Sequence, residues 1–303
     1  MPSAQMQQVL AVLKERQLRS AMEPPVPIAE ARDGFIPAAA IHPIPADVHV
    51  TEVEVGGCVA YWLDAPDADS DTALLFLHGG GFQLGSLTSD GELASRIGRA
   101  AGMRVLFLEY RLAPEHPFPA ALDDVRSAWA WLLNDRGLDA PSLAVAGDSA
   151  GGGLAVSLLV ATRDEGDALP AAAVLMSPTV DLTSSGESMR DRVDQDPIST
   201  PELLRRLASD YLDGADPAAP LATPLFASLR GLPPVLIQVG TADLLLSDSV
   251  RLDAAIRAAD GPVTLEIGEG LPHVYQLNAD TPEAMEATTR IGRFLRHNVR
   301  TAP

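Results

Sequence analysis

The segment GDSAG at residues 147–151 sets a serine between two glycines, with one residue on each side. The spacing G-x-S-x-G is typical of a sharp turn between a strand and a helix that exposes a serine nucleophile. The apolar run Leu143–Ala146 precedes this segment, and the helix-compatible sequence GGGLAVSLLVA follows it. Such a turn tolerates only small neighbours and directs the helix N-terminus at developing negative charge. We therefore predict that Ser149 is a nucleophile; the alternative is a glycine-rich turn without chemistry.

A second glycine cluster, HGGGF at residues 78–82, directly follows the apolar run ALLFL. Three glycines leave backbone N–H groups unshielded, and such groups can donate hydrogen bonds to an oxyanion. A phosphate-binding loop is a weaker reading, because no lysine follows either cluster and neither spells G-x-G-x-x-G. We predict that this loop faces the negative charge that forms when Ser149 attacks a carbonyl; a flexible turn is the alternative.

A serine nucleophile needs a base, and the sequence offers six histidines. His273 follows the apolar run Val263–Ile267 and precedes a helix pattern, which is where the base belongs in the chain order serine, acid, histidine. His78 belongs to the glycine loop, and we expect it to order that loop by hydrogen bonding. The remaining histidines are His42, His49, His116 and His297.

The acid of such a site should follow an intervening strand. Asp243 is the first acidic residue after the apolar run Val235–Val239, and it lies 30 residues before His273. Asp248 is the alternative. It stands where the next helix begins, and an N-cap role suits it better.

These residues need elements that bring them together. Short, nearly continuous apolar runs are typical of parallel strands covered on both faces. The sequence has six: Ala73–Leu77, Val105–Leu108, Leu143–Ala146, Ala172–Met176, Val235–Val239 and Val263–Ile267. Helix patterns lie between them, at Leu122–Leu133 and Leu252–Ala259, and another follows at Ile291–Leu295. This alternation predicts an α/β fold with a doubly wound sheet, preceded by a hairpin formed by Val48–Val55 and Cys58–Leu63.

Two segments fall outside this alternation. Met6, Val9, Leu10 and Leu13 share one face of an amphipathic helix that ends at a cluster of prolines at residues 24–27. From there to about residue 47 we find no clear periodicity. Residues 184–225 contain a polar stretch, a helix pattern and a proline-rich return, which we interpret as an insertion above the sheet.

The composition limits the partners of the protein. Its 303 residues include 22 Lys and Arg against 41 Asp and Glu, a net charge of −19, and 47% are apolar, enough for a sizeable core. The acidic balance argues against nucleic-acid binding and against anionic membranes. The single cysteine fits a reducing cytoplasm, and we find neither a secretory signal nor a membrane-spanning stretch. We therefore expect a cytoplasmic protein with no nucleic-acid or membrane partner.

In combination, the motifs resemble those of the hormone-sensitive-lipase-like (family IV) bacterial carboxylesterases of the α/β-hydrolase fold. The matching segments are HGGGF at 78–82, EYRLAPEHPFPAALDD at 109–124, GDSAGG at 147–152, the acid at Asp243 and GLPH at 270–273. The resemblance covers nearly the whole chain, although the acid segment DLLLSD at 243–248 is one residue longer than usual. It implies a catalytic triad of Ser149, Asp243 and His273. It also implies an oxyanion hole formed by the backbone N–H groups of Gly80, Gly81 and Ala150.

The resemblance also implies a mostly parallel central sheet flanked by helices in one domain of residues 1–303, with a small helical cap from about 1–45 and about 184–225. The implied activity is hydrolysis of small, uncharged short- to medium-chain acyl esters through an acyl-enzyme, with no metal or organic cofactor. Hydrolysis of medium-ring or monoterpene-type lactones by the same triad is the alternative. A non-catalytic binding protein is a further possibility, but all three triad positions are filled. Relatives that pair suggest a homodimer.

Overall fold

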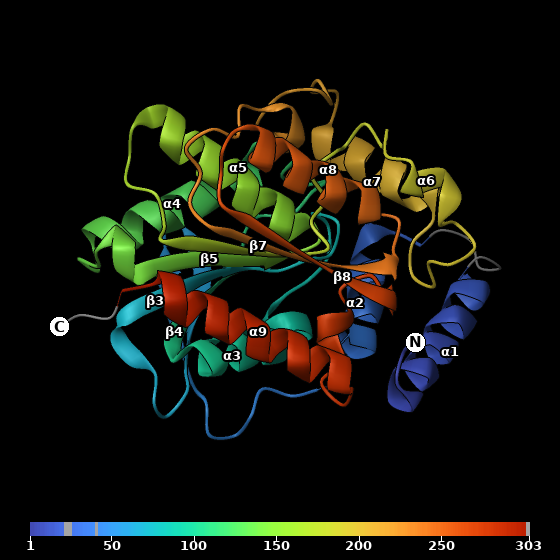
Figure 1. Cartoon of the computed structure of the whole chain (residues 1–303), viewed down its shortest axis with the longest axis horizontal. Coiled ribbons are helices and arrows are strands. Elements are labelled where there is room, and N and C mark those ends of the chain that lie inside the picture. Colours follow the sequence, from blue (N-terminus) through green and yellow to red (C-terminus); the bar gives the residue numbers. More distant parts are fainter. Residues whose placement is uncertain (21–25, 40–41, 301–303) are drawn as a thin grey trace.

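The computed structural model describes residues 1–20, 26–39 and 42–300 of the chain, without the side chains of residues 20 and 34–39. An eight-stranded sheet, in the order β1-β2-β4-β3-β5-β6-β7-β8, runs through it (Figure 1). The strands are β1 (His49–Val55), β2 (Cys58–Asp64), β3 (Asp69–Leu77), β4 (Met103–Leu108), β5 (Leu143–Asp148), β6 (Ala172–Met176), β7 (Val235–Ala242) and β8 (Val263–Pro272). The hairpin β1–β2 is antiparallel and β2 joins β4 antiparallel, whereas β4, β3 and β5 to β8 are parallel.

Helices cover both faces of the sheet. They are α1 (Ala4–Ser20), α2 (Ile28–Ala39), α3 (Leu87–Ala101), α4 (Ala120–Asn134), α5 (Ala150–Glu165), α6 (Ser188–Asp191), α7 (Pro201–Leu212), α8 (Leu246–Ala258) and α9 (Pro282–Asn298). Three short 3-10 turns, η1 (Ala140–Ser142), η2 (Pro224–Phe226) and η3 (Tyr275–Leu277), complete the described part. Helices α3 and α9 lie on one face of the sheet, and α4, α5 and α8 lie on the other (Figure 1). None of the helices in the described residues has the length and apolarity to cross a membrane.

The apolar runs of the sequence become strands because both of their faces are covered. In β3, Leu75 and Leu77 join the core under α4, α5 and α8, whereas Leu74 and Phe76 join the core under α3 and α9. Alternate side chains of a strand point to opposite faces, so a run of consecutive apolar residues supplies both cores. Each of the six predicted runs lies in one of the strands, and the α/β fold is confirmed.

Three helices were not predicted from the sequence: α2, α3 and the four-residue α6. Helix α2 lies where no periodicity was expected, because its sequence includes Gly34 and Pro37, which ordinarily weaken or end a helix. Helix α3 has a regular apolar spacing, and it ends at Gly102, whose left-handed conformation (φ 72°) is typical of a helix C-terminus. The amphipathic pattern at the N-terminus forms α1, while residues 21–25, which hold two of the expected terminating prolines, lie outside the described residues.

The carboxyl ends of the parallel strands lie at one edge of the sheet. In an open α/β sheet, this edge is the usual place for a ligand-binding site. Helices α1, α2, α6 and α7 gather beyond this edge (Figure 1). The first two belong to the N-terminal segment and the last two to the predicted insertion at 184–225. The arrangement is compatible with the predicted cap, which stays a prediction.

Candidate active site

Ser149 occupies the turn between β5 and α5. Its backbone has φ 51° and ψ −118°, a strained conformation for a residue with a side chain. The turn is fixed to the neighbouring strand, because the Ser149 N–H donates to the carbonyl of Met176 at 2.8 Å. A Cβ atom on Gly147 would lie 2.4 Å from Gly151, and one on Gly151 would lie 1.9 Å from the carbonyl oxygen of Leu77. Both glycines of the motif are therefore required by the close approach of backbone.

Ser149, His273 and Asp243 come together at this edge. The Ser149 Oγ lies 2.9 Å from His273 Nε2, and His273 Nδ1 lies 3.2 and 3.1 Å from the two carboxylate oxygens of Asp243. Asp243 follows β7 and is buried, and His273 follows β8. The Leu245 N–H donates to Asp243 Oδ1 at 2.8 Å and so orients the carboxylate. This order of groups suits a serine activated by an imidazole base, which a carboxylate holds in place.

The three amides expected to form the oxyanion hole lie beside this serine. Ala150 is the first residue of α5, and Gly80 and Gly81 line the same cavity as Ser149. Within the described residues, no carbonyl or side chain accepts a hydrogen bond from the N–H groups of Gly80, Gly81 or Ala150. Backbone N–H groups normally have a partner, so these three can donate to a ligand.

Buried contacts from behind hold the glycine loop. His78 is buried, its Nδ1 lies 2.7 Å from the carbonyl of Gly79, and its ring stacks on Tyr110 with centroids 4.3 Å apart. Burial lowers the pKa of His78 to about 4, so its ring is neutral and serves the loop structurally. The Gly79 N–H donates to Asp148 Oδ1 at 3.0 Å, which ties the loop to the residue before Ser149.

Helix α2 supports the same loop from outside. The Arg32 Nε donates to the carbonyl of Gln83 at 2.9 Å, and its Nη2 donates to the carbonyl of Ala113 at 2.9 Å and to Glu115 at 2.7 Å. A planar guanidinium can serve several acceptors at once in this way. The helix missed in the sequence therefore holds the residue that follows the HGGGF loop together with the 113–115 segment.

The charges around His273 favour its protonated form. Burial lowers the pKa of His273, but the charge and hydrogen bond of Asp243, with the charges of Asp196 and Asp148, outweigh burial and raise it to about 9. Burial itself, followed by the nearby Asp90, raises the pKa of Asp148 well above its ordinary value. These charges therefore favour an imidazolium at residue 273.

Asp248 does not act as the predicted N-cap. Helix α8 begins at Leu246 and its N-cap residue is Leu245, so Asp248 lies in the first turn. Its Oδ2 instead accepts the N–H groups of Val180 and Asp181, both at 3.0 Å. Burial, together with the nearby Asp181, raises the pKa of Asp248 to about 7. The residue was misassigned because its partners lie in a segment far away in the sequence.

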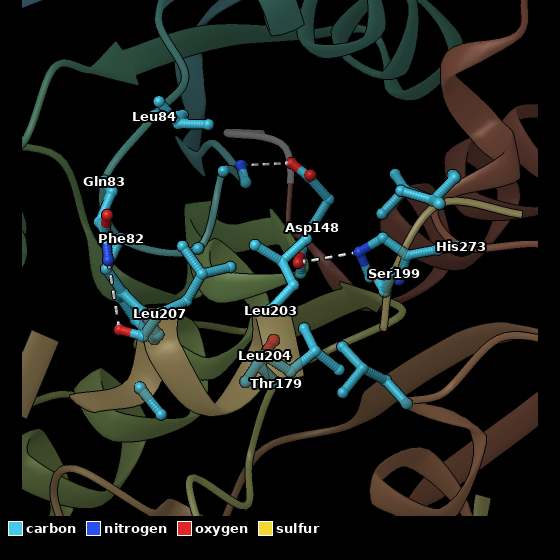
Figure 2. A pocket seen from close by; sticks show the side chains of 18 of the residues that line it. Phe82, Gln83, Leu84, Asp148, Thr179, Ser199, Leu203, Leu204, Leu207 and His273 are labelled. Carbon is cyan, nitrogen blue, oxygen red and sulfur yellow. Dashed lines mark hydrogen bonds between the residues drawn. The ribbon is translucent and has the colours of Figure 1, made fainter. Parts of the chain in front are cut away.

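A mostly apolar cavity of about 370 Å³ opens onto Ser149 and His273. Helix α7 contributes Leu203, Leu204 and Leu207, and Figure 2 shows these leucines lying together along the cavity that His273 also lines. Further apolar residues come from α1, α2, the stretch after β6 and the 184–225 segment: Leu13, Ile28, Leu182, Met189 and Ile198. His273 is the only histidine of the described residues at this cavity. An apolar cavity with a few polar groups at one end is typical of a small-molecule site.

Sequence reasoning missed two buried carboxylates near the triad, Asp148 and Asp196. Asp148 accepts the Gly79 N–H, and Asp196 accepts the N–H of Leu244, next to Asp243. Asp148 lies within the GDSAG motif, so its place between two glycines could have marked it. No local pattern marks Asp196.

Comparisons with known proteins agree with this geometry. A family described as alpha/beta hydrolase fold matches residues 74–277. An acetyl-hydrolase of Streptomyces hygroscopicus is 45% identical over 253 residues, which are 83% of each chain. An esterase of Acinetobacter venetianus is 37% identical over 74% of this chain and 75% of its own.

Solved structures extend the similarity to the whole chain. A crystal structure of an esterase from the bacterial hormone-sensitive lipase family has 41% identity and a TM-score of 0.94, and the match covers 99% of this chain and all of the other. A structure of EstE5 soaked with p-nitrophenyl butyrate has 40% identity and a TM-score of 0.92, covering 98% and 99%. The chain therefore belongs to the α/β-hydrolase fold family and, within it, to the bacterial esterases of the hormone-sensitive-lipase type.

Proposed function

We propose that the protein is a serine carboxylesterase that hydrolyses small, uncharged short- to medium-chain acyl esters through an acyl-enzyme. One observation carries the proposal: the hydrogen-bonded series of Ser149, His273 and Asp243 opens into an apolar cavity, beside three amides that have no acceptor among the described residues. The relatives named acetyl-hydrolase and esterase support this reaction class. The uncharged butyrate ester soaked into EstE5 supports the substrate class.

In the first step, the Ser149 Oγ attacks the carbonyl carbon of the ester while His273 Nε2 takes the hydroxyl proton. The oxygen of the tetrahedral intermediate accepts hydrogen bonds from the N–H groups of Gly80, Gly81 and Ala150. Asp243 holds the tautomer of His273 and stabilises the imidazolium. The intermediate then collapses, its C–O bond breaks, and the imidazolium gives its proton to the leaving alcohol.

In the second step, a water molecule attacks the acyl-enzyme. His273 Nε2 takes a proton from this water, and the same three amides hold the second oxyanion. When the bond between the acyl carbon and Ser149 Oγ breaks, the imidazolium returns its proton to the serine. The carboxylic acid leaves, and the enzyme regains its starting state.

A substrate panel tests the proposed substrate class. We expect kcat/KM on p-nitrophenyl esters to be highest for acyl chains of about two to eight carbons, and at least about tenfold lower for palmitate. The reason is that a cavity of about 370 Å³ encloses only a limited apolar group. A medium-ring lactone in the same panel is the control for the alternative. Faster turnover of the lactone than of every ester would replace the ester proposal, and a maximum at palmitate would contradict the chain-length limit.

The pH dependence follows from the pKa of His273. Only the neutral imidazole can take the serine proton, and a pKa of about 9 leaves it mostly protonated at neutral pH. We therefore expect kcat/KM to rise with pH from neutral toward about pH 9 before it levels off. Initial rates on an uncharged ester, followed by pH-stat between about pH 6 and 10, measure this rise of kcat/KM with pH. A profile already level below about pH 7 would contradict it.

A further inference from the structure

Asp196 is a buried carboxylate in the loop between α6 and α7, and the hydrogen bonds of its side chain in the described residues go to backbone N–H groups rather than to the triad. Its Oδ1 accepts the N–H groups of Ile198 and Ser199, both at 2.8 Å, and its Oδ2 accepts the N–H of Leu244 at 2.9 Å. A buried carboxylate is costly unless it is hydrogen-bonded, and here three backbone donors serve it. Asp196 therefore joins the 184–225 segment directly to the residue that follows Asp243.

The backbone carbonyl of Leu244 is also bound by the 184–225 segment. The Ser188 Oγ donates to the carbonyl of Leu244 at 2.5 Å. The Ser188 N–H donates to Ser247 Oγ at 2.9 Å, and the Ser247 N–H donates to Ser188 Oγ at 3.0 Å. The loop that carries Asp243 is thus fixed from the 184–225 segment at two points, one charged and one neutral.

Helix α1 reaches the same loop. The side-chain amide of Gln17 donates to the carbonyl of Asp196 at 3.0 Å and to that of Ser199 at 3.1 Å. A continuous series of hydrogen bonds therefore runs from α1 through residues 196–199 to Leu244. From there the backbone leads to Asp243, which holds His273.

We propose that Asp196 is a positioning residue of the triad, which fixes the loop of Asp243 from the predicted cap and adds its negative charge behind the Asp243–His273 pair. The inference rests on the proposed function. A displacement of a catalytic group by about 1 Å can cost on the order of 10²-fold in rate, so a tether one residue from Asp243 can control turnover. The charge acts through space on the imidazolium that forms during each step.

The surrounding charges give the direction of this effect. The carboxylates of Asp243, Asp196 and Asp148 all raise the pKa of His273, against the effect of burial. Burial and the charge of Asp243 raise the pKa of Asp196, whereas His273 and the donated N–H bonds of Ser199 and Leu244 lower it. Removal of the charge at residue 196 should therefore make His273 easier to deprotonate.

The test compares Asp196→Asn with two matched variants by kcat, KM and the pH profile on p-nitrophenyl butyrate. Asn keeps one acceptor oxygen and loses the charge, so we expect kcat to fall about tenfold or more, with KM little changed. We also expect the acid limb to move to lower pH by roughly half a unit. Asp194→Asn removes the same charge from an exposed side chain two residues away, and should match the wild type. Ser188→Ala removes only the neutral tether. It should lower kcat without moving the acid limb of the pH profile.

The outcomes separate the two proposals. Wild-type enzyme without Ser149-dependent turnover would contradict the proposed function itself. An active wild type with an unmoved acid limb in folded Asp196→Asn would overturn the role of Asp196, even if kcat falls, because a merely structural residue would give that result. If thermal melting shows that Asp196→Asn does not fold, Ser188→Ala decides. A fall in its kcat of more than about threefold, with KM and the melting temperature unchanged, supports the positioning of the Asp243 loop by the 184–225 segment, and a smaller change overturns it.

Discussion

Ser149→Ala is expected to lower kcat for p-nitrophenyl butyrate by about 10⁶-fold, because the groups of a triad act as a unit and fail together when the nucleophile is removed. In this site, the Ser149 Oγ is the hydroxyl within hydrogen-bond distance of His273 Nε2, at 2.9 Å. Loss of the hydroxyl leaves the amides of Gly80, Gly81 and Ala150 intact. The activity that remains would report what oxyanion stabilisation and binding contribute without a covalent step.

Turnover and covalent labelling together check this result. A fluorophosphonate probe should label the wild type at one serine and leave Ser149→Ala unlabelled. The matched control is Ser157→Ala on α5, the helix that follows Ser149, where a buried hydroxyl donates to the carbonyl of Gly153. That variant should be labelled and should turn over within about threefold of the wild type. Turnover of Ser149→Ala within about tenfold of the wild type would refute the assignment of the nucleophile.

The sequence predicts those parts of this site that depend on residues close together in the chain. The turn at Ser149 is recognisable because both required glycines, 147 and 151, stand within one five-residue motif, although the carbonyl that Gly151 must accommodate belongs to Leu77. His273 and Asp243 are found from the order of elements, since each follows a strand whose apolar run is plain. The strands themselves are predictable because burial on both faces requires consecutive apolar residues.

The parts that escape prediction depend on contacts between distant segments. The bond between Asp148 and Gly79 spans 69 positions, and the bond between Asp196 and Leu244 spans 48. Asp148 ends a strand within a recognisable motif and Asp196 lies in a loop, but no neighbouring residue indicates the distant partner of either. The N-cap role expected of Asp248 was wrong for the same reason, since the donors that it serves lie in another segment. Helix α2 likewise forms in spite of Pro37, which no local pattern predicts.

Asp243→Asn is expected to lower kcat by about 10⁴-fold while the protein stays folded, because an amide holds the imidazole in the wrong tautomer. The contacts give the reason. The Leu245 N–H donates to Asp243 Oδ1, so an asparagine would keep its oxygen there and turn its NH₂ group toward His273 Nδ1. Nδ1 would then accept, and Nε2 would carry its proton toward Ser149 and could not act as a base.

Asp248→Asn is the matched variant, because Asp248 is the other candidate for the acid. Both donors of Asp248 reach one oxygen, Oδ2, so an asparagine can keep both bonds. We expect it to lose less than about tenfold in kcat.

Fluorophosphonate labelling should be slow but complete in Asp243→Asn, since its nucleophile remains. Labelling therefore separates a misoriented base from a missing serine. A loss near 10⁴-fold in Asp248→Asn, with Asp243→Asn close to wild type, would move the acid to Asp248. The hydrogen bonds to His273 argue against that outcome, because both oxygens within reach of Nδ1 belong to Asp243.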